Sequence, residues 1–461
     1  MRNIGAQIVF LLLIVLAVAC RKEEMFTNDS SAKLSFSSDN IVFDTVFTSI
    51  GSVTQWAKVY NYNENAVRIS EIKLAGGAVS PFEININGVA ANQSGNVEVR
   101  GNDSINIFIK VTINPTAAEL PFIVKDSITF LTNGNRQAIR LQAHGQNAHI
   151  LKGGIISQNT VWDNKMPYIV YNTVRVNNNS TLTIPGKSRI YFHKGSKLEI
   201  DGTLIIDGTV TDSVVLGSDR LERIYRDEPG QWLGLYFTGS SVNNKINHTV
   251  IKNAIVGIQS DSLPSTGSPK ILLTNSTVKN MQVAGFVGYK TSLSAFNNLF
   301  FNCGQHLVYG AYGGDYNLKQ NTFANYTNSF PRSTPSVFFT DAMPISLRTS
   351  ALSLNITNNI IWGNVEEELV FDNKGTLVNS IFQNNLIRNK NLAFIGNGNI
   401  LNADPQFINA QSDRFKLNSG SPAGNKGTNL SGDFYYNLYL RTDKAGRQRP
   451  FPSDLGCFEI Q

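Results

Sequence analysis

The sequence His248-Thr-Val-Ile-Lys-Asn253 returns in altered form five more times before residue 390. The later copies are Asn275-Ser-Thr-Val-Lys-Asn280, Asn297-Asn-Leu-Phe-Phe-Asn302, Gln320-Asn-Thr-Phe-Ala-Asn325, Asn358-Asn-Ile-Ile-Trp-Gly363 and Asn384-Asn-Leu-Ile-Arg-Asn389. Their starting positions are 27, 22, 23, 38 and 26 residues apart. A short apolar strand cannot bury its apolar face alone, so this period predicts stacked coils of a solenoid. Asn suits the corners because it tolerates left-handed backbone angles and because stacked amides hydrogen-bond from coil to coil.

The composition favours all-β structure and gives no sign of nucleic-acid binding. Charged residues make up only 16% of the 461 residues, and no amphipathic helical run follows Phe26. The formal charge is +6, and its Lys and Arg residues are scattered rather than clustered. We therefore do not expect a nucleic-acid partner.

Residues 1–19 have the form of a signal peptide, with an apolar run from Ile8 to Val18. The run is shorter than the ~20 residues that a spanning helix needs. Its end, Leu16-Ala-Val-Ala-Cys20, resembles a bacterial lipobox. The resemblance implies cleavage before Cys20, acylation of Cys20 and anchoring of the protein in a membrane by lipid. The alternative is an uncleaved signal anchor in which the cysteine stands by chance.

The residues after Cys20 predict where in the cell the protein is located. Lys22, Glu23 and Glu24 resemble the signal of one Lys and two acids that sends some outer-membrane lipoproteins to the cell surface. The rest of the segment 20–32 is polar and is expected to be a tether. The predicted location is therefore the outer membrane, on the cell surface.

Residues 33–147 alternate apolar and polar side chains in short runs, which predicts a β-sandwich. The segment resembles bacterial immunoglobulin-like domains related to major sperm protein and pilus chaperones. The matching pieces are Phe43-Asp-Thr-Val-Phe47, Gly51, Lys58-Val-Tyr-Asn61, Phe82, Val111-Thr-Ile-Asn-Pro115, Ser127-Ile-Thr-Phe-Leu-Thr-Asn133 and Leu141-Gln-Ala-His-Gly145. The resemblance implies a spacer or docking module.

Residues 153–400 carry the solenoid pattern and resemble the right-handed parallel β-helix family. In Leu198-Glu-Ile-Asp-Gly-Thr-Leu-Ile-Ile-Asp-Gly208 we expect Leu198, Ile200, Leu204 and Ile206 to point inward. The period gives roughly ten coils. Two stretches, 219–231 and 326–353, interrupt the rhythm and are expected to loop out onto one face, often the binding face.

Residues 401–461 resemble the terminal region of choice-of-anchor Q domain proteins. The resemblance rests on Asp404-Pro-Gln-Phe407, Asp413-Arg-Phe-Lys-Leu417, Gly420-Ser-Pro-Ala423, Gly427, Arg447-Gln-Arg-Pro450 and Asp454-Leu-Gly-Cys-Phe-Glu459. This sequence departs from the family's pattern at Asn425 and Cys457. We expect this section to cap the solenoid, with Phe407, Phe415, Leu417 and Leu455 on the last coil.

Cys303 and Cys457 are expected to be buried free thiols, although a pair would form if their backbones approached within ~7 Å. No metal site is predicted, because the histidines are dispersed.

An enzyme is one alternative, since many right-handed β-helices are polysaccharide lyases or glycoside hydrolases. Hydrolases need two carboxylates ~5–9.5 Å apart, and the sequence has no Asp-Asp pair. Its densest acidic cluster is Glu366, Glu367 and Glu368 with Asp372, followed by the base Lys374. A lyase would use such a base and often Ca²⁺. A solvated turn explains the same cluster; no other cofactor is expected.

Ligand binding without catalysis is the other interpretation. Aromatic rings stack on sugars, and guanidinium groups pair with carboxylates or sulfates. The candidates are Tyr309, Tyr312, Tyr316, Arg332, Phe338, Phe339 and Arg348. Packing at corners or under loops is the alternative role for the aromatic residues.

Five hydroxyl residues follow Asp in a pattern that resembles a bacterial O-glycosylation acceptor: Thr45, Ser104, Ser127, Ser213 and Ser262. A turn residue that leads into a strand would give the same pattern.

The sequence thus predicts a surface lipoprotein that binds or displays glycan or a partner protein. A lyase or hydrolase, and a structural subunit of an outer-membrane complex, remain the alternatives.

Overall fold

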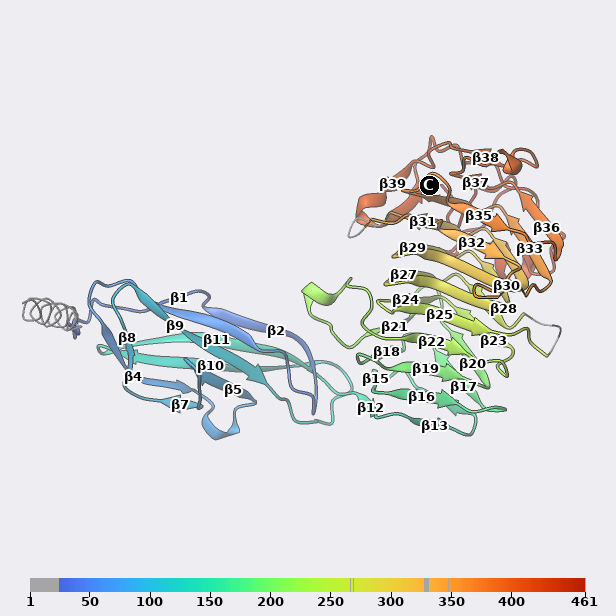
Figure 1. Cartoon of the computed structure of the whole chain (residues 1–461). Helices are drawn as coiled ribbons and strands as arrows, with labels where there is room; N and C mark the ends of the chain where they lie inside the picture. Colours follow the sequence, from blue (N-terminus) through green and yellow to red (C-terminus); the bar gives the residue numbers. More distant parts are fainter. Residues whose placement is uncertain (1–24, 266, 268, 327–330, 347, 461) are drawn as a thin grey trace, which may run out of the picture. The chain divides into compact units, whose positions relative to one another are not determined.

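The computed structural model describes residues 25–265, 267, 269–326, 331–346 and 348–460. The predicted signal peptide, Cys20, Lys22, Glu23 and Glu24 lie outside the described residues. The chain divides into two compact units, the first ending at Asn147 and the second beginning at Ala148 (Figure 1). Within the described parts, no helix is long and apolar enough to cross a membrane.

The first unit is a β-sandwich, as predicted. One sheet has the order β1-β3-β9-β5-β6 and the other β2-β11-β10-β4-β7, with β8 beside β4. The strands are β1 Ser35–Phe36, β2 Asn40–Phe47, β3 Gln55–Asn61, β4 Val67–Leu74, β5 Phe82–Ile86, β6 Val89–Ala90, β7 Gln93–Ser94, β8 Val97–Val99, β9 Asp103–Val111, β10 Phe122–Thr132 and β11 Asn135–Gln146, with the short helix η1 Gly77–Val79. Alternating residues such as Ile105, Ile107 and Ile109 point into one core between the sheets.

The second unit is a right-handed parallel β-helix, as predicted, with three faces that we call A, B and C. Face A is a parallel sheet of β12 His149–Leu151, β15 Tyr168–Val170, β18 Arg189–Phe192, β21 Val214–Ser218, β24 Thr249–Lys252, β27 Thr277–Met281, β29 Leu299–Cys303, β31 Thr322–Asn325, β34 Ile360–Gly363, β37 Leu386–Ile387 and β38 Ile400–Leu401. These 11 described strands mark the coils, against roughly ten expected.

Faces B and C are joined into one sheet because two long strands bend across both. Face B holds β13 Gly154–Ile156, β16 Thr173–Val176, β19 Lys197–Ile200, β22 Gly234–Phe237, β25 Val256–Asp261, the first halves of β28 Ala284–Phe296 and β30 His306–Lys319, β32 Val337–Thr340 and β35 Leu369–Asp372. Face C holds β14 Thr160–Val161, β17 Thr181–Pro185, β20 Thr203–Asp207, β23 Asn244–Asn247, β26 Ile271–Thr274, the second halves of β28 and β30, β33 Leu352–Thr357 and β36 Leu377–Gln383.

The interior of the solenoid is built from every second residue of each strand. Leu198, Ile200, Leu204 and Ile206 are all fully buried there, which confirms the predicted alternation. Cys303 lies in this interior, whereas Cys457 belongs to a separate cluster outside face A, and both are buried free thiols as predicted. Burial raises the pKa of Cys303 to about 12 and that of Cys457 to about 11.

The asparagines of the repeat form the corner between faces C and A. The first residue of each copy, for example Asn297 (φ 56°) or Asn358 (φ 59°), takes the left-handed conformation. In the last four copies the second residue is Asn, and these residues form a ladder of amide hydrogen bonds that ends at Asn399. The Nδ2-to-Oδ1 distances are 3.0 Å from Asn298 to Asn321, 3.0 Å from Asn321 to Asn359, 3.1 Å from Asn359 to Asn385 and 3.0 Å from Asn385 to Asn399. Both properties predicted for these asparagines are therefore observed.

The two predicted insertions differ in kind. Residues 219–231 form one loop between β21 and β22, with the short helix η2 Arg223–Tyr225. The stretch 326–353 is not one insertion, because it contains β32, a regular strand of face B. Side chains alternate along β32, so that Val337 and Phe339 are buried inside the solenoid and Phe338 lies on its outer side.

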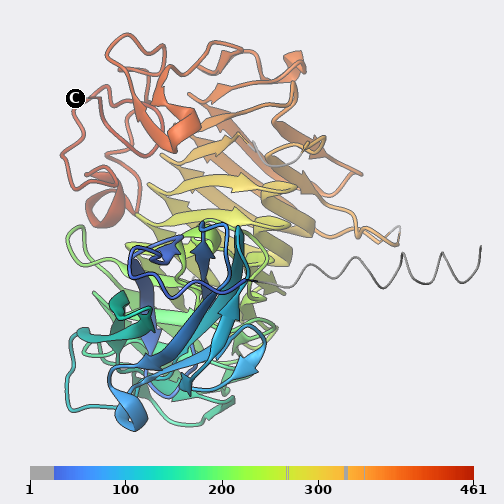
Figure 2. The same cartoon turned by 90° about the vertical axis from the view of Figure 1, so that its left-hand side faces the viewer.

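The C-terminal segment covers more of the solenoid than the last coil. Phe407, Phe415, Leu417 and Leu455 pack on outward residues of β29 to β37, among them Phe301 and Trp362. The segment contains β39 Phe407–Asn409, η4 Ala410–Ser412, β40 Arg414–Leu417 and the π-helix η5 Tyr436–Leu440. It continues along one side of the solenoid (Figure 2), where Lys444 Nζ donates to the carbonyl of Asn275 at 2.8 Å.

A different segment closes the interior at the last coil. The short helix η3 Leu392–Phe394 places Phe394 in the interior core, against Phe382 at 5.1 Å between ring centroids. Phe407 and its neighbours pack against the outside of the last coil at Ile400, as expected, but they do not close its interior. They bury the apolar outer side of face A, which extends over several coils.

Candidate ligand-binding surface

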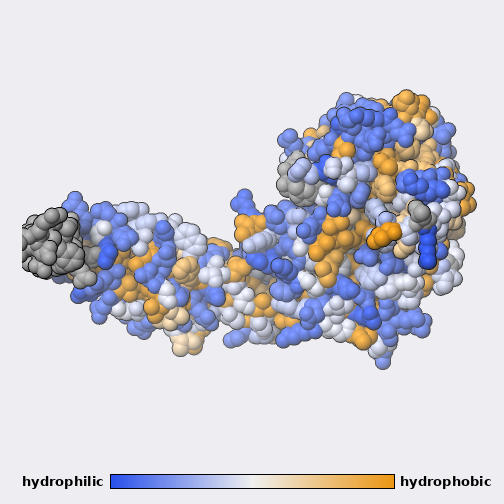
Figure 3. Space-filling view, in the orientation of Figure 1, coloured by the Kyte–Doolittle hydropathy of each residue, from blue (hydrophilic) through white to orange (hydrophobic). Residues whose placement is uncertain are grey.

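A column of half-buried side chains runs along the outer side of face B. Register places Tyr236, Gln259, Val287, Tyr309, Phe338 and Val370 opposite one another on successive strands. They point outward because their neighbours on each strand point into the core. In Figure 3, hydrophobic residues gather on the solenoid over β25 and β28, between hydrophilic ones.

Four aromatic residues of this face form a cluster that we call the aromatic strip: Tyr289, His306, Tyr309 and Phe338. The rings of Tyr309 and Phe338 are nearly parallel, 5.4 Å apart at 8°. His306 lies 5.1 Å from Tyr309, and Tyr289 contacts Tyr309 edge-on at 6.3 Å. Burial lowers the pKa of His306, so its imidazole is neutral at pH 7. The strip is therefore an uncharged aromatic surface across three coils.

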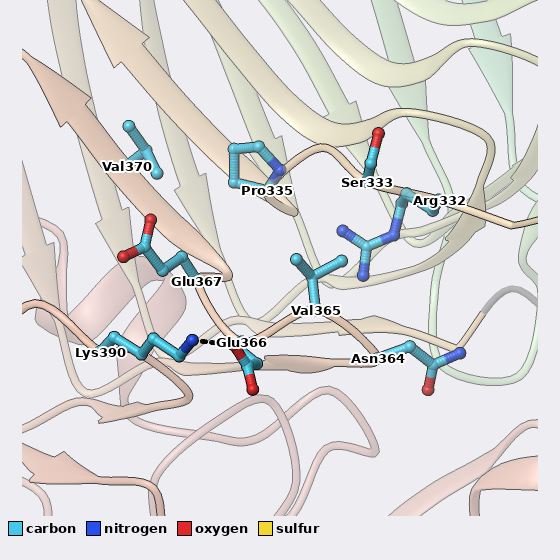
Figure 4. Close-up of a pocket in the computed structure, with 9 residues that line it drawn as sticks. All are labelled: Arg332, Ser333, Pro335, Asn364, Val365, Glu366, Glu367, Val370 and Lys390. Carbon is cyan, nitrogen blue, oxygen red and sulfur yellow. Dashed lines mark ion pairs between the residues drawn. The ribbon is translucent and has the colours of Figure 1, made fainter.

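A hollow of about 480 Å³ lies beside the aromatic strip. Its lining includes Val370, which is next to Phe338 on the following strand. Its lining also includes Pro335, Glu366, Glu367 and Lys390 (Figure 4). Glu366 and Lys390 form an ion pair in which both side chains are 63% exposed. The hydrogen bond from Lys390 lowers the pKa of Glu366. The hollow thus offers charged hydrogen-bonding groups beside an aromatic surface.

Arg332 and Glu368 are buried structural residues, which corrects both predictions about them. Two hydrogen bonds of 2.6 and 2.9 Å join the guanidinium to the carboxylate. Glu368 also accepts from the backbone N–H groups of Ser336 and Val365. With side chains 1% and 0% exposed, Arg332 is not available to bind an anionic ligand and Glu368 is not available for catalysis. The pair fastens the loop before β32 to the loop before β35.

Two of the predicted stacking residues are also buried. Tyr316 and Phe339 point into the solenoid and are 0% exposed, so neither can contact a ligand. Burial raises the pKa of Tyr316 far above its usual range. Gly310 makes room for this ring, because a Cβ there would lie 2.7 Å from Tyr316 Cζ. Tyr309 and Phe338 keep the outward positions that ligand binding requires.

Tyr312 and Arg348 lie at the corner between faces B and C. The N–H of Tyr312 donates to the carbonyl of Ala342 at 2.9 Å, and Lys290 lies over its ring at 5.4 Å. Arg348 is exposed on the connection between β32 and β33, which also contains Ala342. This corner is basic and aromatic, but it is separate from the Glu366–Lys390 ion pair.

The acidic cluster does not converge on one point. Glu368 is buried, Glu366 and Glu367 point to different sides (Figure 4), and Asp372 pairs with Lys374 at 2.7 Å on the surface. A general acid for glycoside hydrolysis has a raised pKa, whereas that of Glu366 is lowered. Among the described residues, no group of three His, Cys, Asp or Glu is arranged to hold a metal ion.

The five Asp-Ser and Asp-Thr positions differ in exposure. Ser213 and Ser262 are exposed, whereas Thr45, Ser104 and Ser127 lie half-buried in β2, β9 and β10. Asp126 accepts hydrogen bonds from the N–H groups of Ser127 and Gly76, at 2.7 and 3.0 Å. This is the structural role that a turn-forming aspartate would have. Glycosylation at these positions stays a prediction.

Sequence reasoning missed Tyr236, Tyr289, His306 and Lys390. Tyr289 directly precedes a corner at Lys290 (φ 50°). The sequence therefore does not indicate that Tyr289 belongs to a long strand. Only the register between β28 and β30 brings Tyr289 and Tyr309 together.

Part of the chain matches the model of a known protein family. Residues 148–325 match the family described as the right handed beta helix region. No curated protein matches the chain. The family match therefore agrees with the second unit.

Several solved structures resemble a part of the chain. A family 123 glycoside hydrolase from Clostridium perfringens is 11% identical over 26% of this chain and 30% of that one, with a TM-score of 0.18. A PapD-like domain of human CEP192 is 10% identical over 27% and 91%, with a TM-score of 0.18. The periplasmic chaperone SfaE is 9% identical over 24% and 57%, with a TM-score of 0.17. Thus this chain spans less than a third of the hydrolase, and TM-scores this low carry no functional argument.

Proposed function

We propose that this protein is a lipid-anchored surface protein that binds glycan without cleaving it, through the aromatic strip of face B. The observation that carries the proposal is the parallel pair Tyr309 and Phe338 on adjacent coils, beside a hollow with charged walls. Aromatic rings stack on the apolar faces of sugars, while polar groups bind the hydroxyls. A glycan that lies along the solenoid axis would meet both kinds of group.

The membrane anchor and the location are part of this proposal and rest on the sequence around Cys20. The immunoglobulin-like resemblance of the first unit supports a spacer that holds the β-helix away from the membrane. The resemblance of residues 401–461 to choice-of-anchor Q domains agrees with a surface protein. A partner protein in the outer membrane is the second ligand class that the same strip would accept.

Cleavage is the competing function, because the right-handed β-helix fold also serves lyases and hydrolases. The pairing of Glu366 with Lys390 favours binding over hydrolysis, because it lowers the pKa of the Glu366 carboxyl, whereas the general acid of a hydrolase has a raised pKa. The hydrogen bond to Glu366 also raises the pKa of Lys390, which disfavours the Lys390 amine as the base of a lyase.

The test uses a panel of acidic and neutral polysaccharides, scored for binding and for chain cleavage with and without Ca²⁺. We expect binding without new reducing ends or unsaturated sugars. The double variant Tyr309→Leu, Phe338→Leu keeps apolar volume and should weaken binding at least tenfold, with an unchanged melting temperature.

Tyr62→Leu is the matched control, because Tyr62 is a 67% exposed aromatic residue of the first unit. It should bind like the wild type. Released sugars would replace the binding assignment with an enzymatic one, and Glu366, Glu367, Asp372 and Lys374 would then be substituted first. Unchanged binding by the double variant would show that the strip is not the site.

A further inference from the structure

Short polar side chains cover the outer side of face C over three successive coils, formed by β28, β30 and β33. One outward column consists of Ser292, Asp315 and Ser353, and the next consists of Ser294, Asn317 and Asn355. Neighbouring coils are ~4.8 Å apart, so the two columns form a polar grid about 10 Å long.

Between β20 and β36, the column of Asn317 is short and polar only on these coils, whereas the column of Ser353 continues to Asn379 on the following coil. On earlier coils the column of Asn317 continues as Ile205, Lys245 and Leu272, and on the following coil as Ile381. A solvated face alone would not require the change from large or apolar residues to short polar ones. The change coincides with a hollow of about 440 Å³.

Walls from two other parts of the chain bound this hollow, which we call the face C groove. Leu263 and Pro264 belong to the loop after β25, and Tyr435 belongs to the C-terminal segment. Tyr435 is held in place by Phe296, with ring centroids 4.9 Å apart. The groove therefore combines a polar floor with apolar and aromatic walls.

The floor has hydrogen-bonding capacity that the protein leaves unused. Asn317 Oδ1 is buried and accepts no hydrogen bond from the described residues. A buried acceptor without a donor is unfavourable, so a rotation of the half-buried Asn317 side chain that exposes Oδ1 to a ligand hydroxyl would be stabilising. Asp315 offers an exposed carboxylate in the neighbouring column, and the described residues that line the groove include no Lys or Arg.

We infer that the face C groove is a second binding site, for an uncharged oligosaccharide that lies along the solenoid axis. Sugar hydroxyls satisfy both donors and acceptors of the floor, and the walls contact the apolar faces of the rings. Asp315 disfavours uronates and sulfated sugars by charge repulsion. The site lies on a different face from the aromatic strip and does not depend on it.

The experiment uses the full chain and a panel of uncharged hexasaccharides built from glucose, xylose, mannose or galactose, with hexagalacturonate as the charged comparison. Two variants test the floor: Asn317→Leu, which removes the unpaired acceptor, and Ser353→Trp, which fills the groove. Thr183→Trp is the matched control, because Thr183 has an outward position on the same face several coils away.

We expect one or more uncharged hexasaccharides to bind, and Ser353→Trp and Asn317→Leu to weaken that binding at least tenfold. Thr183→Trp and Tyr309→Leu, Phe338→Leu should retain it. Asn317→Leu should melt at the wild-type temperature or above, because it removes an unsatisfied buried group; this separates lost binding from lost folding.

Absence of binding to every uncharged hexasaccharide would overturn the inference, as would a preference for hexagalacturonate or binding that survives Ser353→Trp. Loss of all binding in Tyr309→Leu, Phe338→Leu alone would assign the ligand to the aromatic strip. Loss in the groove variants alone would uphold the groove and reject the strip, so the two proposals fail separately.

Discussion

The two adjacent asparagines in a copy such as Asn358-Asn359 have different roles. Asn358 is the left-handed residue that turns the chain, and its side chain contacts the C-terminal segment at Thr428. Asn359 is fully buried and links its coil to those above and below. The first Asn is suited to its position because Asn tolerates the left-handed conformation. The second is suited to its position because its side-chain amide both donates and accepts hydrogen bonds.

Removal of one ladder amide should destabilise the solenoid. Asn321 Nδ2 donates to Ala295 O at 2.8 Å and to Asn359 Oδ1 at 3.0 Å, and its Oδ1 accepts from Asn298. Asn321→Leu would leave these buried partners unpaired, so we expect a loss on the order of 3 kcal/mol in the free energy of unfolding. Denaturant titration measures it. Asn178→Leu, at an exposed position, should change stability by less than about 0.5 kcal/mol.

His248 should make stability depend on pH. It occupies a left-handed corner (φ 45°) where four of the five other copies have Asn and one has Gln320. Burial, assisted by Lys444 and opposed by Asp207, lowers its pKa from 6.5 to about 4. The unfolded chain therefore takes up a proton at higher pH than the folded chain. The stabilising contribution is complete above pH 6.5 and is lost as pH falls toward 4.

His248→Asn should remove this dependence. Its melting temperature should equal that of the wild type at pH 7.5 and exceed it at pH 5. Thermal melting monitored by circular dichroism across this range gives the comparison. Parallel pH profiles of the two proteins would show that another group is responsible.

At the scale of elements, the C-terminal segment is part of the fold of the solenoid rather than an appendage. Face A is apolar on both sides between β29 and β37, so it needs cover on the outside. The segment supplies this cover, and near its far end Arg449, which pairs with Glu459 of the same segment, donates a hydrogen bond to Asn297 Oδ1 at 2.8 Å. It also forms one wall of the face C groove.

Loss of this segment should make the solenoid aggregate. Truncation after Leu401 exposes outward residues of face A such as Phe301 and Trp362. Size-exclusion chromatography and melting of the truncated protein test this expectation. A soluble monomer with unchanged melting would contradict it.

A matched pair of point variants separates packing from chain length. Phe415 is 2% exposed and Phe434 is 83% exposed in the same segment. Phe415→Asp should lower the melting temperature strongly, because it buries an unpaired charge. Phe434→Asp should leave the melting temperature nearly unchanged.

At the scale of the whole molecule, the sequence predicts an anchor, a tether and two folded units in series. Both faces proposed for binding belong to the second unit. In the sequence, the predicted tether and the first unit stand between Cys20 and this second unit.

Substitution at the predicted anchor should release the protein. Cys20→Ala should appear in the soluble fraction or as an uncut precursor. With Lys22, Glu23 and Glu24 all replaced by Ala, the protein should stay membrane-bound but resist protease added to whole cells. Western blots of fractionated and protease-treated cells give both readouts. Unchanged digestion of the triple variant would exclude these residues as an export signal.

Local patterns in the sequence determined the β-helix, the β-sandwich and the corner asparagines. The period of the repeat and the alternation of Leu198, Ile200, Leu204 and Ile206 are properties of neighbouring residues, so they can be read before folding.

Only the tertiary structure decided which candidate residues face a ligand. Tyr309, Tyr312 and Tyr316 were all candidates for stacking, but the glycine-rich stretch that holds them is the long strand β30, in which Tyr309 points outward and Tyr316 inward. Two loops bring Arg332 and Glu368 together as a buried ion pair. The aromatic strip and the face C groove each consist of residues from different coils. Such juxtapositions depend on the register between coils and on packing across the fold, and no local pattern carries that information.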